Sequence, residues 1–219
     1  DRENHYMIAN MLSVRRSLEH ANEKRREMEK ANERLLEKSE TDPLTRLANR
    51  FRLNDYLERA FERTRDDHRA FAVEILDIDY FKEYNDNYGH QAGDACIVAI
   101  ADELRKMQSH DTFCARYGGD EFIIIYEYKT EDEVFSMADS LRERILDRRI
   151  EHVCSKALPV VTISQGICFD VAPEGSRSWD FLHAADMMLY EVKKRSRNNI
   201  SLGHLDAKEA RYGEERKFL

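Results

Sequence analysis

Three carboxylates next to predicted strand ends are the side chains best suited to chemistry. Asp77 comes near the end of a mostly apolar stretch, Phe71–Asp79, that is typical of a buried strand. Asp120 and Glu121 directly follow two glycines in a predicted hairpin. Carboxylate oxygens are the ligands that Mg²⁺ prefers in proteins, so these strand ends are candidates for a divalent-metal site. The alternative is that all three carboxylates are simply solvated.

Two nearby features are suited to binding phosphate. Gly118 and Gly119 lack side chains, so the backbone there can approach a ligand closely. The turn that follows Asp77 includes Phe81 and Lys82. A turn after a strand exposes backbone N–H groups that can bind phosphate, and Lys82 adds a positive charge. A tight hairpin also uses paired glycines for its geometry alone.

The elements that must position these residues are strands mixed with helices. Apolar spacing and turn residues predict helices near 49–65, 96–107, 131–147 and 181–192, and strands near 71–79, 113–116, 121–126, 160–169 and 198–202. The two short strands in the middle of the chain are joined by the hairpin at Gly118 and Gly119. The pattern predicts an α+β domain with a central, mostly antiparallel sheet flanked by helices.

Residues 1–40 form a separate segment that contains no Gly or Pro. Three- and four-residue steps select Met7, Met11, Val14, Leu18, Ala21, Arg25, Met28, Asn32 and Leu35. This heptad seam predicts a coiled coil, in which Arg25 and Asn32 interrupt the apolar core, and a polar core residue can fix a two-stranded register. A single charged helix is the alternative. We therefore predict an N-terminal coiled-coil helix over 1–40, a folded domain over 41–203 and a polar tail over 204–219.

The composition limits the classes of function. The chain has 43 Asp and Glu against 35 Lys and Arg, a formal net charge of −8, which disfavours nucleic-acid binding. No apolar run reaches the roughly 20 residues that cross a bilayer. The four cysteines form no CxxC pair, so we interpret them as thiols of a cytoplasmic protein rather than a zinc site. The chain begins without Met, and we expect an upstream sensor domain outside it.

The order of the motifs resembles the GGDEF domain, the catalytic domain of diguanylate cyclases. The resemblance covers about 42–202 and rests on Asp42-Pro43-Leu44-Thr45, Asp77-Ile78-Asp79-Tyr80-Phe81-Lys82, Gly89-His90-Gln91-Ala92-Gly93-Asp94, Arg116-Tyr117-Gly118-Gly119-Asp120-Glu121-Phe122, Thr162-Ile163-Ser164-Gln165-Gly166, and Lys193 with Arg197-Asn198. Three positions depart from the family pattern, namely Arg46, Glu74 and Gln165, and none of them belongs to the predicted metal site.

The resemblance implies a nucleotidyl-cyclase-like palm that condenses two GTP molecules into cyclic di-GMP and two pyrophosphates. A metal-assisted 3′-hydroxyl would attack the α-phosphate, with Mg²⁺ or Mn²⁺ as cofactor. The implied metal ligands are Asp77, the Ile78 carbonyl, Asp120 and Glu121. The implied catalytic residues are Asp120, Glu121 and Lys82.

The resemblance also implies how the substrate is bound. Phe81, Lys82, Lys193 and Arg197 would hold phosphates, Asn85 and Asp94 would bind guanine, and Gly118 with Gly119 would leave room for the nucleotide. One GTP per subunit implies a homodimer, which the N-terminal helix would hold together.

Two other functions stay open at this point. One is a catalytically inactive GGDEF domain that acts as a receptor for GTP or cyclic di-GMP. The other is a different nucleotidyl transferase on a similar palm. The family's usual product-inhibition motif, Arg-x-x-Asp, is replaced here by Ser109, His110, Asp111 and Thr112, so we expect no tight product inhibition.

Overall fold

The computed structural model describes residues 2–38, 40–205 and 211–212. It divides into two units, residues 1–40 and 41–219. The first unit contains one continuous helix, α1 (Arg2–Lys38). Apolar side chains of the predicted seam are exposed along it, among them Met11, Leu18, Met28 and Leu35, each at 60% or more. This helix therefore leaves an apolar seam uncovered within its own unit.

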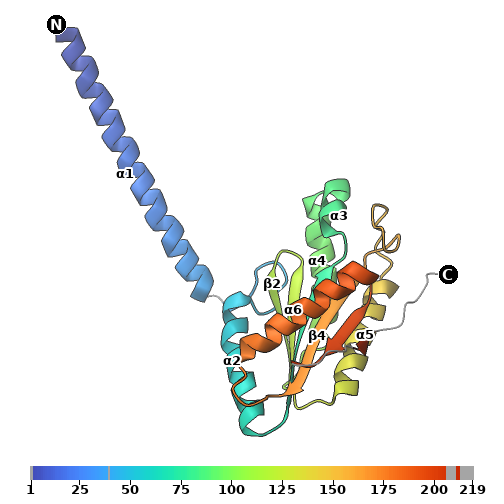
Figure 1. Cartoon of the computed structure of the whole chain (residues 1–219). Coiled ribbons are helices and arrows are strands. Elements are labelled where there is room, and N and C mark those ends of the chain that lie inside the picture. The colour runs from blue at the N-terminus through green and yellow to red at the C-terminus, as the bar shows by residue number, and fades with distance from the viewer. Residues whose placement is uncertain (1, 39, 206–210, 213–219) are drawn as a thin grey trace. The chain divides into compact units, whose positions relative to one another are not determined.

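The second unit is built on a sheet with strand order β2-β3-β1-β4-β5-β6 (Figure 1). The strands are β1 (Ala70–Ile78), β2 (Thr112–Gly118), β3 (Glu121–Glu127), β4 (Ile163–Val171), β5 (Ile200–Gly203) and β6 (Arg211–Tyr212). All neighbouring pairs are antiparallel except β4 and β5, which are parallel. The prediction of an α+β domain with a mostly antiparallel sheet is confirmed.

Helices cover both faces of the sheet. On one face, α2 (Arg50–Asp66) and α6 (Ser178–Arg195) pack against the side chains of Val73 and Ile75. On the other face, α4 (His90–Arg105) and α5 (Glu131–Asp147) pack against Ala72 and Leu76. Since successive strand side chains point to opposite faces, β1 is buried on both sides, and its side chains are apolar except for Glu74 and Asp77.

α6 approaches the sheet unusually closely at Gly166. A Cβ atom at this position would lie 2.2 Å from the backbone nitrogen of Leu189 and 2.3 Å from the carbonyl oxygen of Ala185. The absent side chain lets the helix backbone rest directly on β4. This contact fixes the position of α6, which carries Lys193 near its C-terminal end.

The positions that departed from the family pattern have clear local explanations. Arg46 adopts a φ of 60°, a left-handed conformation that favours glycine. Glu74 is fully buried and accepts a hydrogen bond of 2.7 Å from the Tyr126 hydroxyl. Gln165 is also buried, and its amide donates to the Ala138 carbonyl at 3.2 Å. These positions affect packing, away from the predicted metal ligands.

The structure differs from the sequence predictions in two elements. A short helix, α3 (Phe81–Tyr88), follows β1 where only a turn was expected. The predicted edge strand is β5, but β6 pairs with it from within the segment predicted to be a polar tail. Most of that tail lies outside the described residues. No helix among the described residues combines the length and the apolar character needed to cross a membrane.

Candidate active site at the ends of β1 and β3

Asp77 and Glu121 are directly opposite each other on two antiparallel strands. Asp77 belongs to β1 and Glu121 is the first residue of β3, and the two are paired in the strand register. Directly opposed residues have Cβ atoms about 5 Å apart on the same face of the sheet. Asp120 precedes Glu121 in the hairpin turn. The strand pairing therefore gathers the three predicted metal-binding side chains at one end of the sheet.

The electrostatics of the three carboxylates reflect their crowding. Burial and the nearby charge of Asp120 raise the pKa of Asp77 to about 7, although Lys193 acts in the opposite direction. Burial likewise raises the pKa of Asp120 and of Glu121. Bringing like charges together in a partly buried site disfavours their ionised forms. The cluster therefore attracts positive charge.

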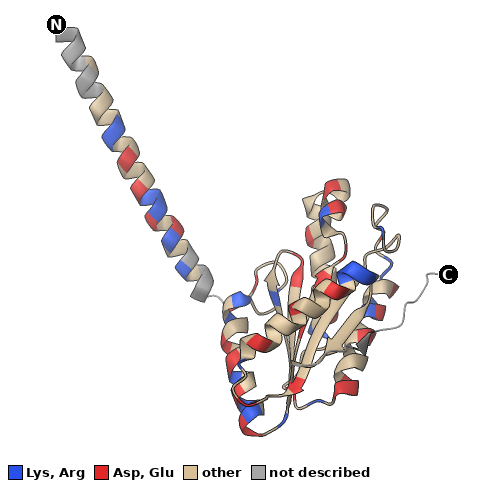
Figure 2. Cartoon of the chain, in the orientation of Figure 1, with Lys and Arg blue, Asp and Glu red and all other residues tan. Residues whose placement is uncertain are grey.

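Two cationic side chains at and just after the end of α6 reach the carboxylate cluster and the nearby Asp79. The ammonium of Lys193 lies 2.9 Å from a carboxylate oxygen of Asp77, and the Arg197 guanidinium lies 3.6 Å from one of Asp79. Figure 2 shows basic residues gathered in the last turn of α6. Both residues were predicted to bind phosphate, and the structure brings them to the strand end where the carboxylates meet.

The donors present are suited to a hard divalent cation. Asp77, Asp120 and Glu121 offer only oxygen atoms, which Mg²⁺ and Mn²⁺ prefer, and Lys193 already places a positive charge on Asp77. Within the described residues, no group of three or more His, Cys, Asp or Glu side chains is arranged to hold a metal ion by itself. Mg²⁺ typically takes only one or two protein carboxylates and completes its shell with water and substrate phosphates. The carboxylates therefore fit such an ion in type.

Asp79 has a structural role that the sequence did not indicate. It is fully buried, and its carboxylate accepts hydrogen bonds from the hydroxyls of Thr162, at 2.8 Å, and Ser164, at 2.6 Å. The backbone N–H of Asn198 also donates to it, at 3.0 Å. Asp79 thus connects the end of β1 to β4 and to the segment after α6. Asp77, two residues earlier, makes its ion pair with Lys193 instead.

Arg116 fixes the hairpin turn, a second role that sequence reasoning missed. Its guanidinium donates to the Gly119 carbonyl at 2.8 and 3.1 Å and lies 3.2 Å from a carboxylate oxygen of Asp42. Asp42 in turn accepts from the Thr45 backbone N–H and hydroxyl. Both residues belong to the quoted motifs, but their long-range pairing could not be read from local spacing. A Cβ at Gly118 or Gly119 would meet no atom within 4 Å, so open space surrounds the turn.

The predicted guanine-binding residues belong to neighbouring helices, α3 and α4. Asn85 is half-buried, and its Oδ1 atom is enclosed with no hydrogen-bond partner among the described residues. Asp94 and Lys82 are exposed, and Phe81 is half-buried. A Cβ at Gly93 would lie 1.8 Å from Asn85 Oδ1, so the absence of a side chain there admits Asn85. The α3–α4 pair therefore offers one enclosed, unsatisfied polar atom, Asn85 Oδ1, in the helix that follows β1.

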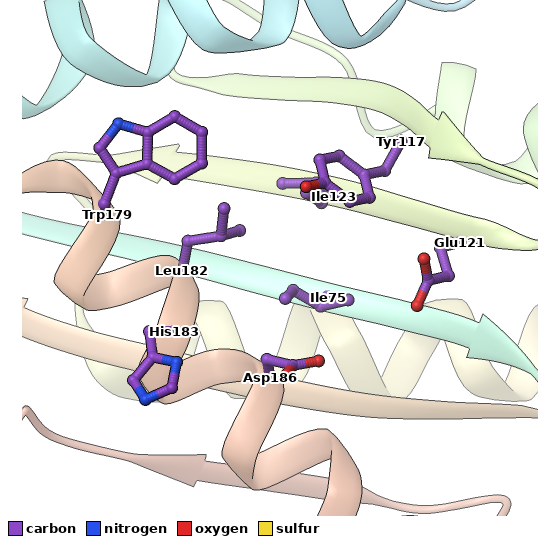
Figure 3. Close-up of a pocket in the computed structure, with 8 residues that line it drawn as sticks. All are labelled: Ile75, Tyr117, Glu121, Ile123, Trp179, Leu182, His183 and Asp186. Carbon is purple, nitrogen blue, oxygen red and sulfur yellow. The ribbon is translucent and has the colours of Figure 1, made fainter.

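A cavity of about 330 Å³ opens on the face of the sheet that carries Glu121. Figure 3 shows Glu121 at the end away from Trp179, with Asp186 on α6 in the same lining. Its walls are Ile75, Tyr117, Glu121, Ile123, Trp179, Leu182, His183 and Asp186. Asp186 contributes to raising the pKa of Glu121, after the larger effects of burial and Asp120. Glu121 is therefore reachable from open space beneath α6.

Comparison with known proteins agrees with this geometry. The sequence profile of the family described as "Diguanylate cyclase, GGDEF domain" matches residues 39–199. Diguanylate cyclase DgcP of Pseudomonas aeruginosa is 35% identical over 167 residues, which cover 76% of this chain and 24% of that protein. Diguanylate cyclase DgcP of Escherichia coli is 29% identical over 170 residues, which cover 78% of this chain and 49% of that protein.

A similar solved structure is that of the coiled coil and GGDEF domain of DgcB from Caulobacter crescentus in complex with c-di-GMP. It has a TM-score of 0.70 and 28% identity, and the match covers 87% of this chain and 100% of the other. The chain spans about a quarter to a half of the length of the two curated relatives. From the profile match, the relatives and the fold together, the chain belongs to the GGDEF domain family of diguanylate cyclases.

Proposed function

We propose that this chain is an active diguanylate cyclase that condenses two GTP molecules into cyclic di-GMP. The observation that carries the proposal is the opposition of Asp77 and Glu121 at one end of the sheet, with Lys193 beside them. A cluster of carboxylates that attracts cations is the feature that a metal-dependent nucleotidyl transferase needs. Relatives named as diguanylate cyclases support the same reaction.

The residues of the chain have separate roles in the proposed reaction. Asp77, the Ile78 carbonyl, Asp120 and Glu121 would hold Mg²⁺ or Mn²⁺, which lowers the pKa of the attacking hydroxyl and neutralises phosphate charge. Asp120 and Glu121 would orient the ribose 3′-hydroxyl toward the α-phosphate. The new phosphodiester bond forms as the bond to pyrophosphate breaks, and the hydroxyl proton leaves to a carboxylate or to water.

Binding of the triphosphate would use positive charge and backbone N–H groups. The first N–H groups of a helix have no partner within that helix, so the first turn of α3 is suited to phosphate. Lys82 lies in that turn, and Lys193 and Arg197 would exchange their contacts with Asp77 and Asp79 for phosphate oxygens. The open space around Gly118 and Gly119 would admit the nucleotide.

Selection of guanine would depend on Asn85 and Asp94. A carboxylate can accept both N1–H and the exocyclic amine of guanine, whereas adenine lacks this pair of donors on the same edge. The enclosed Oδ1 atom of Asn85 has no partner among the described residues, which leaves it free for a ligand after a small side-chain rotation. This arrangement favours guanine over adenine.

Two subunits would have to meet for the reaction, because each would hold one GTP and a symmetric product forms from both. The exposed apolar seam of α1 supports assembly through that helix. The related DgcB structure is described as containing a coiled coil together with its GGDEF domain. We propose a parallel dimer in which α1 raises the local concentration of the second half-site. An upstream sensor domain would act through the same helix.

A catalytically inactive receptor for GTP or cyclic di-GMP is the alternative function. A receptor that catalyses no reaction would have no chemical need for all four of Asp77, Asp120, Glu121 and Lys82. Incubation with GTP and Mg²⁺, followed by chromatography of the products, separates the possibilities. Formation of cyclic di-GMP supports the proposal, cyclic GMP indicates a different cyclase, and unreacted GTP that nevertheless binds the protein indicates a receptor.

A further inference from the structure

Tyr80, between the end of β1 and α3, has a backbone conformation that must be held by contacts elsewhere. Its φ of 55° and ψ of 36° lie in the left-handed region, which is unfavourable for a residue with a Cβ. No side-chain cap supports the start of α3 at this residue. The same turn joins Ile78, a proposed metal ligand through its carbonyl, to Phe81 and Lys82. A change in the backbone geometry of this turn would therefore displace both the proposed metal ligand and the proposed phosphate-binding residues.

His152 is bonded to this turn from the segment between α5 and β4. Its ring is fully buried, and Nε2 lies 3.0 Å from the Tyr80 carbonyl oxygen. A carbonyl oxygen only accepts, so Nε2 carries the proton and donates. The same carbonyl accepts the Tyr84 backbone N–H, the first hydrogen bond of α3, at 3.0 Å. His152 thus bonds to the atom that sets where α3 begins.

The ring of His152 also contacts the buried face of α3. It meets the Tyr84 ring edge-on, with centroids 5.1 Å apart and planes at 90°. Next to it, the Tyr88 hydroxyl donates to Glu151 and accepts the Val153 backbone N–H, each at 3.1 Å. The contacts run along one side of α3. They hold the helix from the side away from its exposed Lys82.

The segment that carries His152 is itself fixed. The His152 backbone N–H donates to the Pro159 carbonyl at 3.0 Å, and Glu151 forms an isolated bridge with Val160. Val161 donates to the Ile150 carbonyl at 2.7 Å, and the next residue, Thr162, bonds to Asp79. The backbone of His152 is therefore held in place by hydrogen bonds to the segment before β4, and its side-chain hydrogen bond can resist displacement of Tyr80.

A core histidine kept for packing alone is the ordinary alternative. That role does not require Nε2 to be aimed at a left-handed residue of the active-site turn. The other ring nitrogen, Nδ1, is buried with no partner among the described residues, so the ring is not oriented to satisfy both of its polar atoms. The Arg197 guanidinium lies 4.3 Å from the centre of the Tyr80 ring. Tyr80 therefore has a contact at its side chain and another, from His152, at its backbone carbonyl.

We propose that His152 is a positioning residue for GTP binding: its Nε2–H fixes the Tyr80 carbonyl and thereby the first turn of α3. The inference rests on the proposed function of that turn in binding the triphosphate. Loss of one neutral hydrogen bond of this kind corresponds to roughly a two- to ten-fold change in an equilibrium constant. The effect belongs on GTP binding, because the ring of His152 contacts Tyr80 and Tyr84 of the α3 turn and not the proposed metal ligands.

The test compares His152→Leu with His152→Gln in the full chain. The Gln amide can still donate from a position close to Nε2, whereas Leu fills space without a donor. We expect Leu to raise the KM for GTP and the calorimetric Kd for the unreactive analogue α,β-methylene-GTP with Mg²⁺ several-fold, with a smaller change in kcat. Gln should restore most of the affinity. Val153→Ala, an exposed side chain in the same segment, is the matched control and should bind as wild type.

Wild-type affinity in a folded His152→Leu variant, or equal loss in the Leu and Gln variants, would overturn the inference. If the Leu variant does not fold, His152→Asn replaces it, because the shorter Asn amide does not reach the Tyr80 carbonyl. Asn must then bind GTP more weakly than Gln, and equal binding overturns the inference. Calorimetry with α,β-methylene-GTP, from which pyrophosphate cannot leave, reports nucleotide binding without turnover. A wild-type protein that binds GTP but makes no cyclic di-GMP therefore contradicts the proposed function while leaving His152 tested.

Discussion

Asp77 and Glu121 occupy paired positions on adjacent antiparallel strands, although 44 positions separate them in the numbering of the chain. The pairing depends on the register of β1 with β3, which is fixed by apolar side chains along both strands. A slip of one residue would turn one of the two carboxylates to the other face of the sheet. The core and the site are therefore set by the same register.

Gly93→Ala should impair nucleotide binding with little effect on folding. The new Cβ would lie 1.8 Å from Asn85 Oδ1, so the Asn85 side chain must move. Its displacement should raise the KM for GTP about ten-fold or more, since a buried polar mismatch costs roughly 1–3 kcal/mol. Steady-state kinetics and thermal unfolding measure the two effects. Ala95→Ser, an exposed change on the same helix, is the control, and an unchanged KM in Gly93→Ala would show that Asn85 does not bind GTP.

Glu74→Gln should stabilise the protein above neutral pH. Burial raises the pKa of Glu74 from its ordinary 4.5 to about 7. An acid whose pKa is raised by folding imposes no penalty below pH 4.5, and the penalty grows as the pH rises toward 7, because the unfolded chain ionises first. The wild type should therefore lose up to about 3 kcal/mol relative to Glu74→Gln between these pH values. Urea unfolding across pH 4.5–8 checks this.

Glu103→Gln is the matched control for that measurement, with the opposite sign. Glu103 is buried but contacts Lys106, Arg144 and Arg148, which hold its pKa below the ordinary value despite burial. Its contribution to stability is present above its unfolded pKa and is lost as the pH falls through the lower folded pKa. The substitution should therefore destabilise at neutral pH. Parallel pH dependences for the two variants would contradict the assignment of Glu74.

Much of this architecture could be predicted from the sequence, because its elements carry strong local signals. The helix over 131–147 has a capping box between Thr130 and Glu133, and its predicted bounds are those of α5. The hairpin was visible in Gly118 and Gly119. The positions of the site carboxylates could be predicted as well, because Asp77 lies near the end of a clear apolar strand and Asp120 and Glu121 directly follow the hairpin glycines.

The features that were missed depend on tertiary contacts. α3 has only eight residues, and a helix of about two turns with no side-chain cap leaves little periodic signal. The pairs Asp42–Arg116 and Tyr80–His152 each join positions more than seventy residues apart. Local patterns contain no information about which distant residue completes such a contact.

Removal of residues 1–40 should weaken dimerisation and make specific activity depend strongly on protein concentration. The exposed seam of α1 is the feature responsible. Leu18→Lys within the seam should act in the same direction, whereas Glu23→Gln, which changes the charge equally outside the seam, should not. Analytical ultracentrifugation measures the association. A full chain that remains monomeric at tens of micromolar, a range in which even a weak interface is populated, would rule out this assembly.

Tight product inhibition should be absent. At the positions of the family's Arg-x-x-Asp motif, Asp111 already contacts Lys129 at 2.9 Å and accepts from the Ser109 hydroxyl at 2.6 Å. These contacts help lower the pKa of Asp111 to about 2 despite the opposing effect of its burial. Calorimetry with cyclic di-GMP should detect no submicromolar binding, and progress curves should not slow early. Tight binding that a Ser109 or Thr112 substitution abolishes would refute this prediction.

The most direct test of the account measures cyclic di-GMP formed from GTP and Mg²⁺ by the wild type, Glu121→Gln and Asp186→Asn. Glu121→Gln replaces a proposed metal ligand by a neutral group of equal size, whereas Asp186→Asn removes a nearby charge in the same cavity that is not a proposed ligand. We expect product from the wild type and from Asp186→Asn, and at least a hundred-fold loss in a folded Glu121→Gln variant, on the order of the loss when one group that stabilises a transition state is removed. Near-normal turnover by Glu121→Gln would contradict the account.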